Sequence, residues 1–180
     1  MSEKIKPSST ATGILEDVLA PGLKLVLCGT APSLISAREK AYYAKPGNRF
    51  WPILHEVALT PYRFSPYEYR SLLKLGIGLT DLCKTHYGND NQLPSDAFDA
   101  LLLKRKILKY EPHILAFDSL HAGKSFLGSK SVTLGLQDTK IGNTLLFICG
   151  STSGINSHWT KQKYSWYELA ELVKKYEVQR

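Results

Sequence analysis

Four short apolar runs, spread along the chain, constrain the fold more than any other feature of the sequence. They cover residues 23–27, 76–79, 114–117 and 145–149. Short runs that are apolar throughout are typical of strands buried on both faces of a sheet. The segments between them carry apolar residues at helical spacing. This alternation predicts an α/β fold with three layers, α/β/α, around a central, mostly parallel four-stranded sheet.

The same spacing sets the expected helices and the domain boundaries. Helices are predicted over residues 48–58, 66–75, 95–110, 121–127 and 164–176, with a short strand or turn over residues 133–136. Ser95 and Asp96 are the expected N-cap of the third helix. The polar residues 1–13 are predicted to form a flexible N-terminal tail, and residues 14–180 a single domain.

Polar turns follow the first and the last apolar run. Small residues at positions 29–33 come after Cys28, and a polar segment at 150–159 comes after Cys149. Small residues at a strand end let backbone amides approach a ligand, and the carboxyl ends of parallel strands meet at one edge of the sheet. An aromatic ring near an amide, here Tyr43 and Asn48, can stack on a planar base and hydrogen-bond its polar edge. We therefore expect a cleft for a planar ligand at this edge.

Charge and composition narrow the classes of partner. The net charge of +7 and the isoelectric point near 9.3 favour a polyanion. The basic cluster Lys104, Arg105, Lys106 and Lys109 is interpreted as a solvated helix face. No apolar segment approaches the ~20 residues of a membrane span, so we expect no membrane partner.

Cysteine and histidine spacing bears on cofactors and location. The 3 cysteines form no CxxC pair and the 5 histidines lack helical metal-site spacing, so we expect neither a metal nor another cofactor. We interpret the cysteines as buried, reduced thiols of a cytoplasmic protein, nucleoid-associated if the source is bacterial. Nothing in the sequence demands more than a monomer.

Four segments, in order along the chain, resemble motifs of the uracil-DNA glycosylase superfamily. They are residues 29–33 (GTAPS), 43–51 (YAKPGNRFW), 78–82 (GLTDL) and 151–156 (STSGIN). The resemblance runs from Leu23 to Trp159 and is nearest to the mismatch-specific uracil/thymine branch and the hypoxanthine-DNA glycosylase branch.

The resemblance implies a DNA glycosylase that flips out a deaminated base and excises it hydrolytically in base excision repair. Uracil is the expected base, and hypoxanthine is the alternative. The implied catalytic candidates are Asn48, Asp81 and His158. The candidates for contact with the base are Gly29, Thr30, Ala31, Tyr43, Phe50 and Ser151. The candidates for contact with DNA, including an apolar wedge that fills the gap left by the flipped base, are Ser33, Ser153, Gly154, Ile155, Asn156, Trp159 and Lys161.

Two positions depart from the family pattern. Ala31 stands where mismatch-specific enzymes place a water-orienting Asn, and Ser151 stands where other members place a His. The hypoxanthine branch, which also lacks that Asn, implies Asn48 as the catalytic residue. These departures leave open a non-catalytic module that binds damaged or abasic DNA. A hydrolase of small nucleotides is a further alternative.

Several site candidates also have a purely structural alternative. Tyr43 and Trp159 could be core residues, Asn48 could cap the helix that follows it, and Asp81 could belong to a turn or helix cap.

Overall fold

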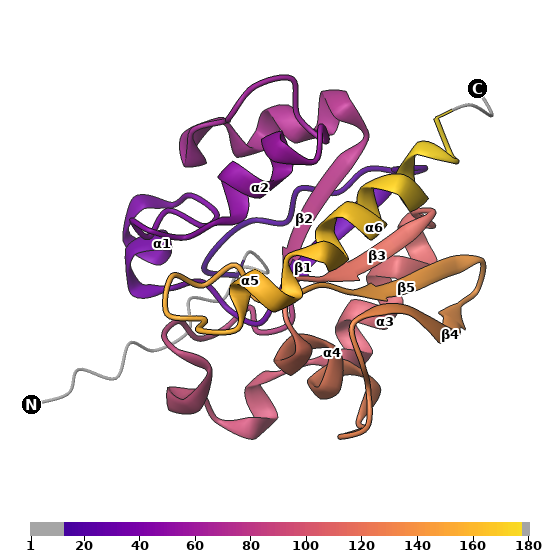
Figure 1. Ribbon diagram of the computed structural model, residues 1–180. Coiled ribbons are helices and arrows are strands. Elements are labelled where there is room, and N and C mark those ends of the chain that lie inside the picture. Colours follow the sequence, from indigo (N-terminus) through magenta and orange to yellow (C-terminus); the bar gives the residue numbers. More distant parts are fainter. Residues whose placement is uncertain (1–12, 178–180) are drawn as a thin grey trace, which may run out of the picture.

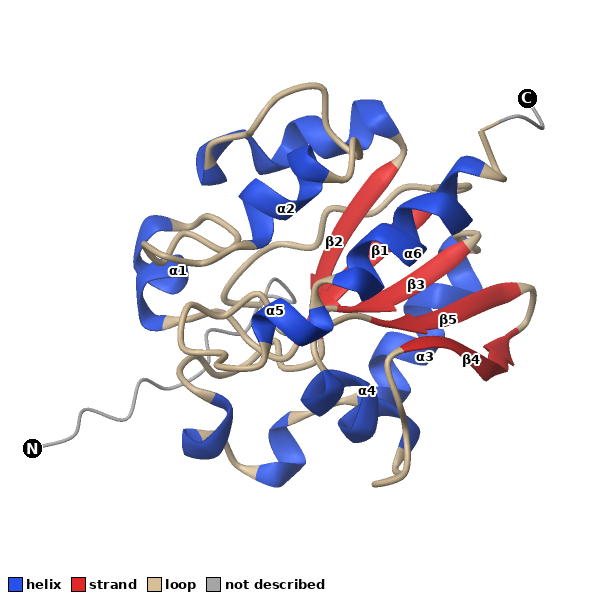
Figure 2. Ribbon diagram, in the orientation of Figure 1, coloured by secondary structure: helices blue, strands red, loops and turns tan. Residues whose placement is uncertain are grey.

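The computed structural model describes residues 13–177, and its centre is a five-stranded sheet in the order β2-β1-β3-β5-β4 (Figure 2). The strands are β1 (Leu25–Gly29), β2 (Ile77–Asp81), β3 (Ile114–Phe117), β4 (Gly135–Ile141) and β5 (Thr144–Ile148). All neighbours pair in parallel except β4, which runs antiparallel to β5 at the edge. The three-layer α/β fold with a mostly parallel sheet is therefore confirmed, with one strand more than the sequence predicts.

Helices cover both faces of the sheet (Figure 1). The α-helices are α1 (Leu34–Glu39), α2 (Phe50–Glu56), α3 (Ala100–Tyr110), α4 (Leu120–Leu127), α5 (Trp159–Gln162) and α6 (Tyr164–Lys174). The 3₁₀ helices are η1 (Pro66–Leu75), η2 (Asp90–Gln92) and η3 (Ser95–Ala97). No helix within residues 13–177 is long and apolar enough to cross a membrane.

The strand side chains alternate between two hydrophobic cores. Leu25 and Leu27 of β1 pack in the core covered by α2, η1 and α6, whereas Val26 and Cys28 pack in the core covered by α3 and α4. Successive side chains of a strand point to opposite faces, so a run that is apolar throughout supplies both cores at once. Trp166 of α6, which is fully buried, anchors the first core.

Several element boundaries differ from the sequence prediction. Residues 66–75 form a 3₁₀ helix, and α3 begins at Ala100. Its N-cap is Asp99, whose carboxylate accepts a hydrogen bond from the Leu102 amide at 2.8 Å, and not Ser95 or Asp96. The short helices α1 and α5 were not predicted.

The edge strand β4 replaces the short strand or turn expected over residues 133–136. Four of its 7 residues are polar and only Gly135 and Ile141 are buried, so it lacks the apolar run that identifies the other strands. The Gly142-Asn143 dipeptide makes the two-residue turn of the β4–β5 hairpin, with φ of Gly142 at 56°.

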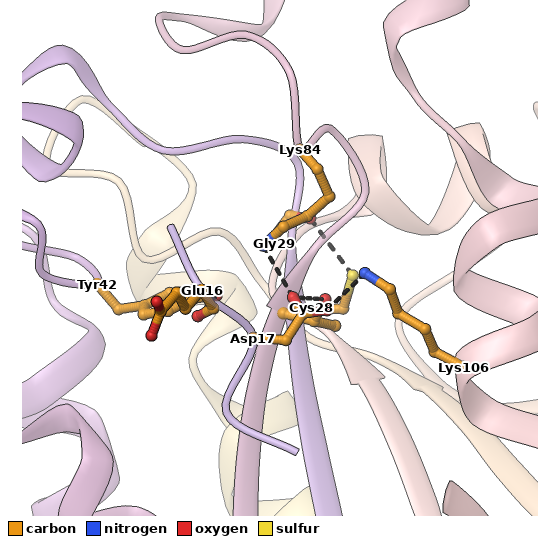
Figure 3. Close-up of polar contacts among 8 residues, drawn as sticks. Glu16, Asp17, Cys28, Gly29, Tyr42, Lys84 and Lys106 are labelled. Carbon is orange, nitrogen blue, oxygen red and sulfur yellow. Dashed lines mark hydrogen bonds and ion pairs between the residues drawn. The ribbon is translucent and has the colours of Figure 1, made fainter. Parts of the chain in front are cut away.

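An ion-pair cluster fixes the segment before β1 to α3 and to the segment that follows β2 (Figure 3). Asp17 pairs with Lys84 at 2.8 Å and with Lys106 at 2.5 Å, and it accepts a hydrogen bond from the Thr80 hydroxyl at 2.7 Å. Burial alone would raise the pKa of Asp17, but these three partners hold it below its ordinary value. Next to Asp17, Val18 forms an antiparallel bridge with Leu79 of β2. Lys106 therefore does not belong to the solvated face predicted for it.

We predict that Asp17→Ala destabilises the protein by roughly 3 kcal/mol, because it leaves two partly buried lysines without their counter-charge. Chemical denaturation at neutral pH measures this change. Glu16→Ala is the matched control, since Glu16 pairs with Arg70 in an exposed position and its loss should cost less than about 1 kcal/mol. Equal losses for the two variants would contradict the structural role given to the Asp17 cluster.

Candidate active site

A cavity of about 480 Å³ lies at the carboxyl ends of the parallel strands. Its lining comes from segments far apart in the sequence, which the strand ends bring together. The lining residues are Leu15, Thr30, Ala31, Pro32, Ser33, Ser36, Tyr42, Tyr43, Lys45, Asn48, Asp81, Gly88, Asn89, Asp90, Asn91, Asp118, Ser119, Ser151, Thr152, Ser153, Ile155 and Asn156. The volume suits a small planar ligand such as a nucleobase.

Gly29 lies where three polar side chains converge. A Cβ atom at this position would lie 2.8 Å from Asp81 Oδ1, 3.1 Å from the Tyr43 hydroxyl and 3.3 Å from Asp118 Oδ2. Any side chain here would displace at least one of these groups. Glycine at the end of β1 is thus a steric condition for the arrangement around it.

Two carboxyl groups lie on either side of this point, Asp81, which is buried, and Asp118, which is half-buried. Burial raises the pKa of Asp118 to about 7, and nearby Asp81 and Asp90 also raise it, against a hydrogen bond from Tyr43 that lowers it. Burial likewise raises the pKa of Asp81 to about 6, although Lys84 opposes the change. Within residues 13–177, Asp81 Oδ2 is buried without a hydrogen-bond partner. The cavity therefore holds carboxyl groups that keep protons to unusually high pH.

Tyr43 forms an aromatic wall of the cavity. Its ring stacks on the fully buried ring of Phe50, with centroids 3.7 Å apart and planes 12° from parallel. Its hydroxyl donates a 2.7 Å hydrogen bond to Asp118 Oδ2. The backbone of Tyr43 has φ of 53°, in the left-handed region that a bulky residue seldom adopts. The neighbouring Tyr42 is the true core tyrosine, and only 1% of it is exposed.

Asn48 both stabilises a helix start and borders the cavity. Its side-chain Oδ1 accepts a hydrogen bond from the Phe50 amide at 2.9 Å, at the first residue of α2. The N-cap position itself is Arg49, so Asn48 is not the N-cap residue, but its side chain does satisfy the amide of the first helical residue. Because the oxygen is engaged there, the side-chain NH₂ group is the part of the amide available to a ligand.

The loop at residues 151–156 is fastened to the segment before α2. Arg49 donates from its backbone amide to Thr152 O at 2.8 Å and from Nη1 to Ser153 O at 2.7 Å. Asn156 Nδ2 donates to Ser151 O at 2.8 Å, so this side chain holds the loop from within. Ile155, at the cavity rim, is 81% exposed, which is unusual for an isoleucine.

Most of the residues predicted for the site line the cavity. They are Thr30, Ala31, Ser33, Tyr43, Asn48, Asp81, Ser151, Ser153, Ile155 and Asn156. Phe50 does not line it but supports Tyr43 from behind, and Gly29 lies close to three polar groups of the site. The remaining predicted residues do not line the cavity; they are Gly154, His158, Trp159 and Lys161. Among them, Trp159 contacts Arg49, whose Cζ lies 5.4 Å from the centre of the indole ring.

Two parts of the site were missed from the sequence. Asp118 directly follows the apolar run of β3, just as Asp81 ends that of β2, so the same strand-end rule applied to it would have found it. Asp90 and its neighbours at 88–91 span a short loop and the start of η2, where the sequence has no apolar periodicity. They are held against the first turn by a 2.5 Å hydrogen bond from the Thr30 hydroxyl to Asp90 Oδ1.

The family model described as the uracil DNA glycosylase superfamily matches residues 16–172. The chain belongs to this superfamily. The resemblance seen in the four motifs is thus confirmed at the level of the superfamily, whose members are DNA glycosylases. Among solved structures, the fold is similar to the solution NMR structure of a "putative Uracil DNA glycosylase" from Methanosarcina acetivorans. The TM-score is 0.63 at 20% identity, over 89% of this chain and 96% of that one.

The raised pKa of Asp118 predicts how stability changes with pH in this glycosylase-family protein. The folded state holds the proton up to about pH 7 and the unfolded state only to about 3.8, so stability falls as pH rises between these values. Between pH 5.5 and 8.5 this group should remove about 2 kcal/mol from the free energy of unfolding. Asp118→Asn should lose correspondingly less over that range, as measured by denaturation at both pH values.

Asp138→Asn is the matched control for that measurement, since Asp138 is exposed on β4. This variant should follow the wild type. Parallel pH dependence of the wild type and Asp118→Asn would show that Asp118 does not hold the proton.

Proposed function

We propose that this protein is a monofunctional DNA glycosylase of base excision repair, which flips a deaminated base into the cavity and hydrolyses its N-glycosidic bond. Uracil is the proposed base. The observation that carries the proposal is the juxtaposition of the Phe50-backed Tyr43 ring, the Asn48 amide and the Asp81 carboxyl in one cavity of base size. In a chain of this superfamily, such a cavity supplies a stacking surface, a polar amide and a group for the polar edge of a base.

Each residue has a proposed task in that reaction. The base would stack on Tyr43, and Asp81, whose Oδ2 lacks a protein partner among the described residues, would hydrogen-bond its edge. The Asn48 NH₂ group would position the attacking water. Backbone amides of the turn at Thr30 and Ala31 would stabilise the negative charge that develops on the base, a type of contact worth about 10²–10³ in rate where it is preorganised.

Hypoxanthine is the second candidate base. Ala31 lines the cavity where the mismatch-specific branch carries a water-orienting Asn, and the hypoxanthine branch also lacks that Asn. Asn48, the catalytic residue that the hypoxanthine branch implies, lines the same cavity. A cavity of about 480 Å³ accommodates a purine as well as a pyrimidine. Parallel assays with both bases decide between them.

The rim of the cavity is proposed to contact the DNA. Ile155 is exposed on a loop braced by Arg49 and would fill the space of the flipped nucleotide. Ser33, Ser153 and Lys161 are proposed phosphate contacts, and the net charge of +7 favours this partner. His158 and Trp159, which do not line the cavity, are also proposed to contact the DNA.

We predict that wild type releases uracil from a labelled duplex oligonucleotide under single-turnover conditions, and that Asn48→Ala slows release at least about 100-fold. Asn48→Asp is the matched variant, because its carboxylate still accepts the Phe50 amide hydrogen bond but has lost the NH₂ group. Both variants should be slow, and only the alanine variant should also lose stability, by about 1 kcal/mol.

Wild-type binding to uracil DNA without release of uracil or hypoxanthine would refute the glycosylase. That outcome would favour the non-catalytic binding module. Cleavage of free nucleosides with indifference to DNA would favour the nucleotide hydrolase instead.

A second prediction concerns the proposed wedge. Ile155→Ala should slow release from duplex DNA by about tenfold while changing release from single-stranded DNA little, since only a duplex has a gap to fill. Leu136→Ala is the control, because Leu136 is 54% exposed on the edge strand β4. An equal effect of Ile155→Ala on both substrates would argue against the wedge.

A further inference from the structure

Asp118 is a half-buried carboxyl group to which the sequence motifs give no task. It lines the cavity directly after β3, and Asp81 lines it at the end of β2. Because β1 pairs in parallel with both strands, the two side chains approach the same point above Gly29 from opposite sides. One oxygen of each lies within 3.3 Å of the position that a Gly29 Cβ would take.

We propose that Asp118 is a second base-reading residue that shares one proton with Asp81, so that the cavity offers a neutral carboxyl donor beside a carboxylate acceptor. This inference rests on the proposed function and deepens it. The neutral carboxyl donates to a carbonyl oxygen of the flipped base, and the carboxylate accepts from the adjacent ring N–H. Uracil and hypoxanthine both carry such a C=O and N–H side by side.

The charges around Asp118 favour a shared proton. The titratable groups that face it are Tyr43 from the segment before α2, Cys28 of β1, Asp81 of β2, Asp90 of η2 and Cys149 after β5. Burial raises the pKa of the tyrosine and of both thiols, which therefore stay neutral. The charges left to face Asp118 from these groups are those of Asp81 and Asp90, and both are negative. Two close carboxyl groups in a buried site do not both ionise near neutral pH.

The donor also answers a chemical need of the reaction. Bond cleavage leaves negative charge on the base, and a donor aimed at a base oxygen strengthens its hydrogen bond as that charge develops. Ser151, at the position where other members carry a His, provides only a hydroxyl, and its oxygen accepts from the Ser153 amide at 3.3 Å. A neutral carboxyl is the stronger donor within the same cavity.

The test is the pH dependence of single-turnover base release between pH 5.5 and 8.5, with uracil and hypoxanthine duplexes. The wild-type rate should be highest near pH 6.5, between the pKa values of Asp81 (about 6) and Asp118 (about 7), and should fall about 20-fold by pH 8.5 as the donor ionises. Asp118→Asn keeps an acceptor for the Tyr43 hydroxyl but has no proton to lose, so its rate should change less than about threefold. Asp138→Asn, with the same substitution on an exposed strand, should follow the wild type.

Two further variants test whether Asp118 is the group that ionises, because they should move the alkaline fall in rate in opposite directions. Tyr43→Phe removes a hydrogen bond that lowers the pKa of Asp118, so the alkaline fall in rate should move to higher pH. Asp81→Asn removes a negative neighbour that raises it, so the fall should move to lower pH. If Asp118 had only a structural role, neither variant would shift the pH at which the rate falls.

The failures of the two proposals are distinguishable. If the wild type releases base but Asp118→Asn keeps the wild-type pH dependence, or is slowed by one factor at every pH, the shared proton is wrong and the glycosylase stands. If the wild type releases neither base at any pH, the glycosylase is wrong and the base-reading role falls with it.

Discussion

The close approach above Gly29 is the constraint on which the site depends. Parallel pairing fixes the register of β1 against β2, with Gly29 opposite Asp81, and against β3, with Cys28 opposite Phe117, one residue before Asp118. This register sends two carboxyl groups to one point, and only a residue without a side chain leaves room for them and for the Tyr43 hydroxyl. The cavity, the aromatic wall and the electrostatics of the site all follow from that geometry.

The electrostatics of the cavity contrast with those of the whole molecule. The chain carries a net charge of +7, which suits a polyanionic partner, yet the cavity is lined by Asp81, Asp90 and Asp118. Acidic groups at the cavity floor would repel phosphates, whereas a nucleobase carries no net charge and offers N–H donors. Under the proposed function, the two charge patterns would separate the tasks, with the overall positive charge favouring the DNA backbone and the carboxyl groups the base.

The sequence predicts what depends on local pattern and misses what depends on contact. Runs apolar throughout identify the parallel strands, and the motif resemblance places Tyr43, Asn48 and Asp81 in the site. The exposed strand β4 and the loop at 88–91 have no such pattern, because edge strands and loops need not be apolar or periodic. Asn48 both bonds the first amide of α2 and lines the cavity, and Lys106 pairs with Asp17 and so leaves the solvated face. Both are tertiary effects. They become visible only when the partner groups are in place.

The site is held in an unfavourable local state by the scaffold around it. The left-handed backbone of Tyr43 costs of order 1–3 kcal/mol. Asp81 Oδ2, which is buried and has no hydrogen-bond partner in the described part of the chain, costs a similar ~1–3 kcal/mol. Contacts on both sides fix Tyr43: the Trp51 indole donates to Tyr42 O at 3.1 Å, and the Ala44 amide donates to Ser36 Oγ at 3.0 Å. Because Phe50 also supports its ring, Tyr43 cannot relax without breaking several contacts at once. A base that hydrogen-bonds Asp81 would offset the cost of its unpaired oxygen, whereas the cost of the Tyr43 backbone is the same with and without a base and serves to hold the ring in place.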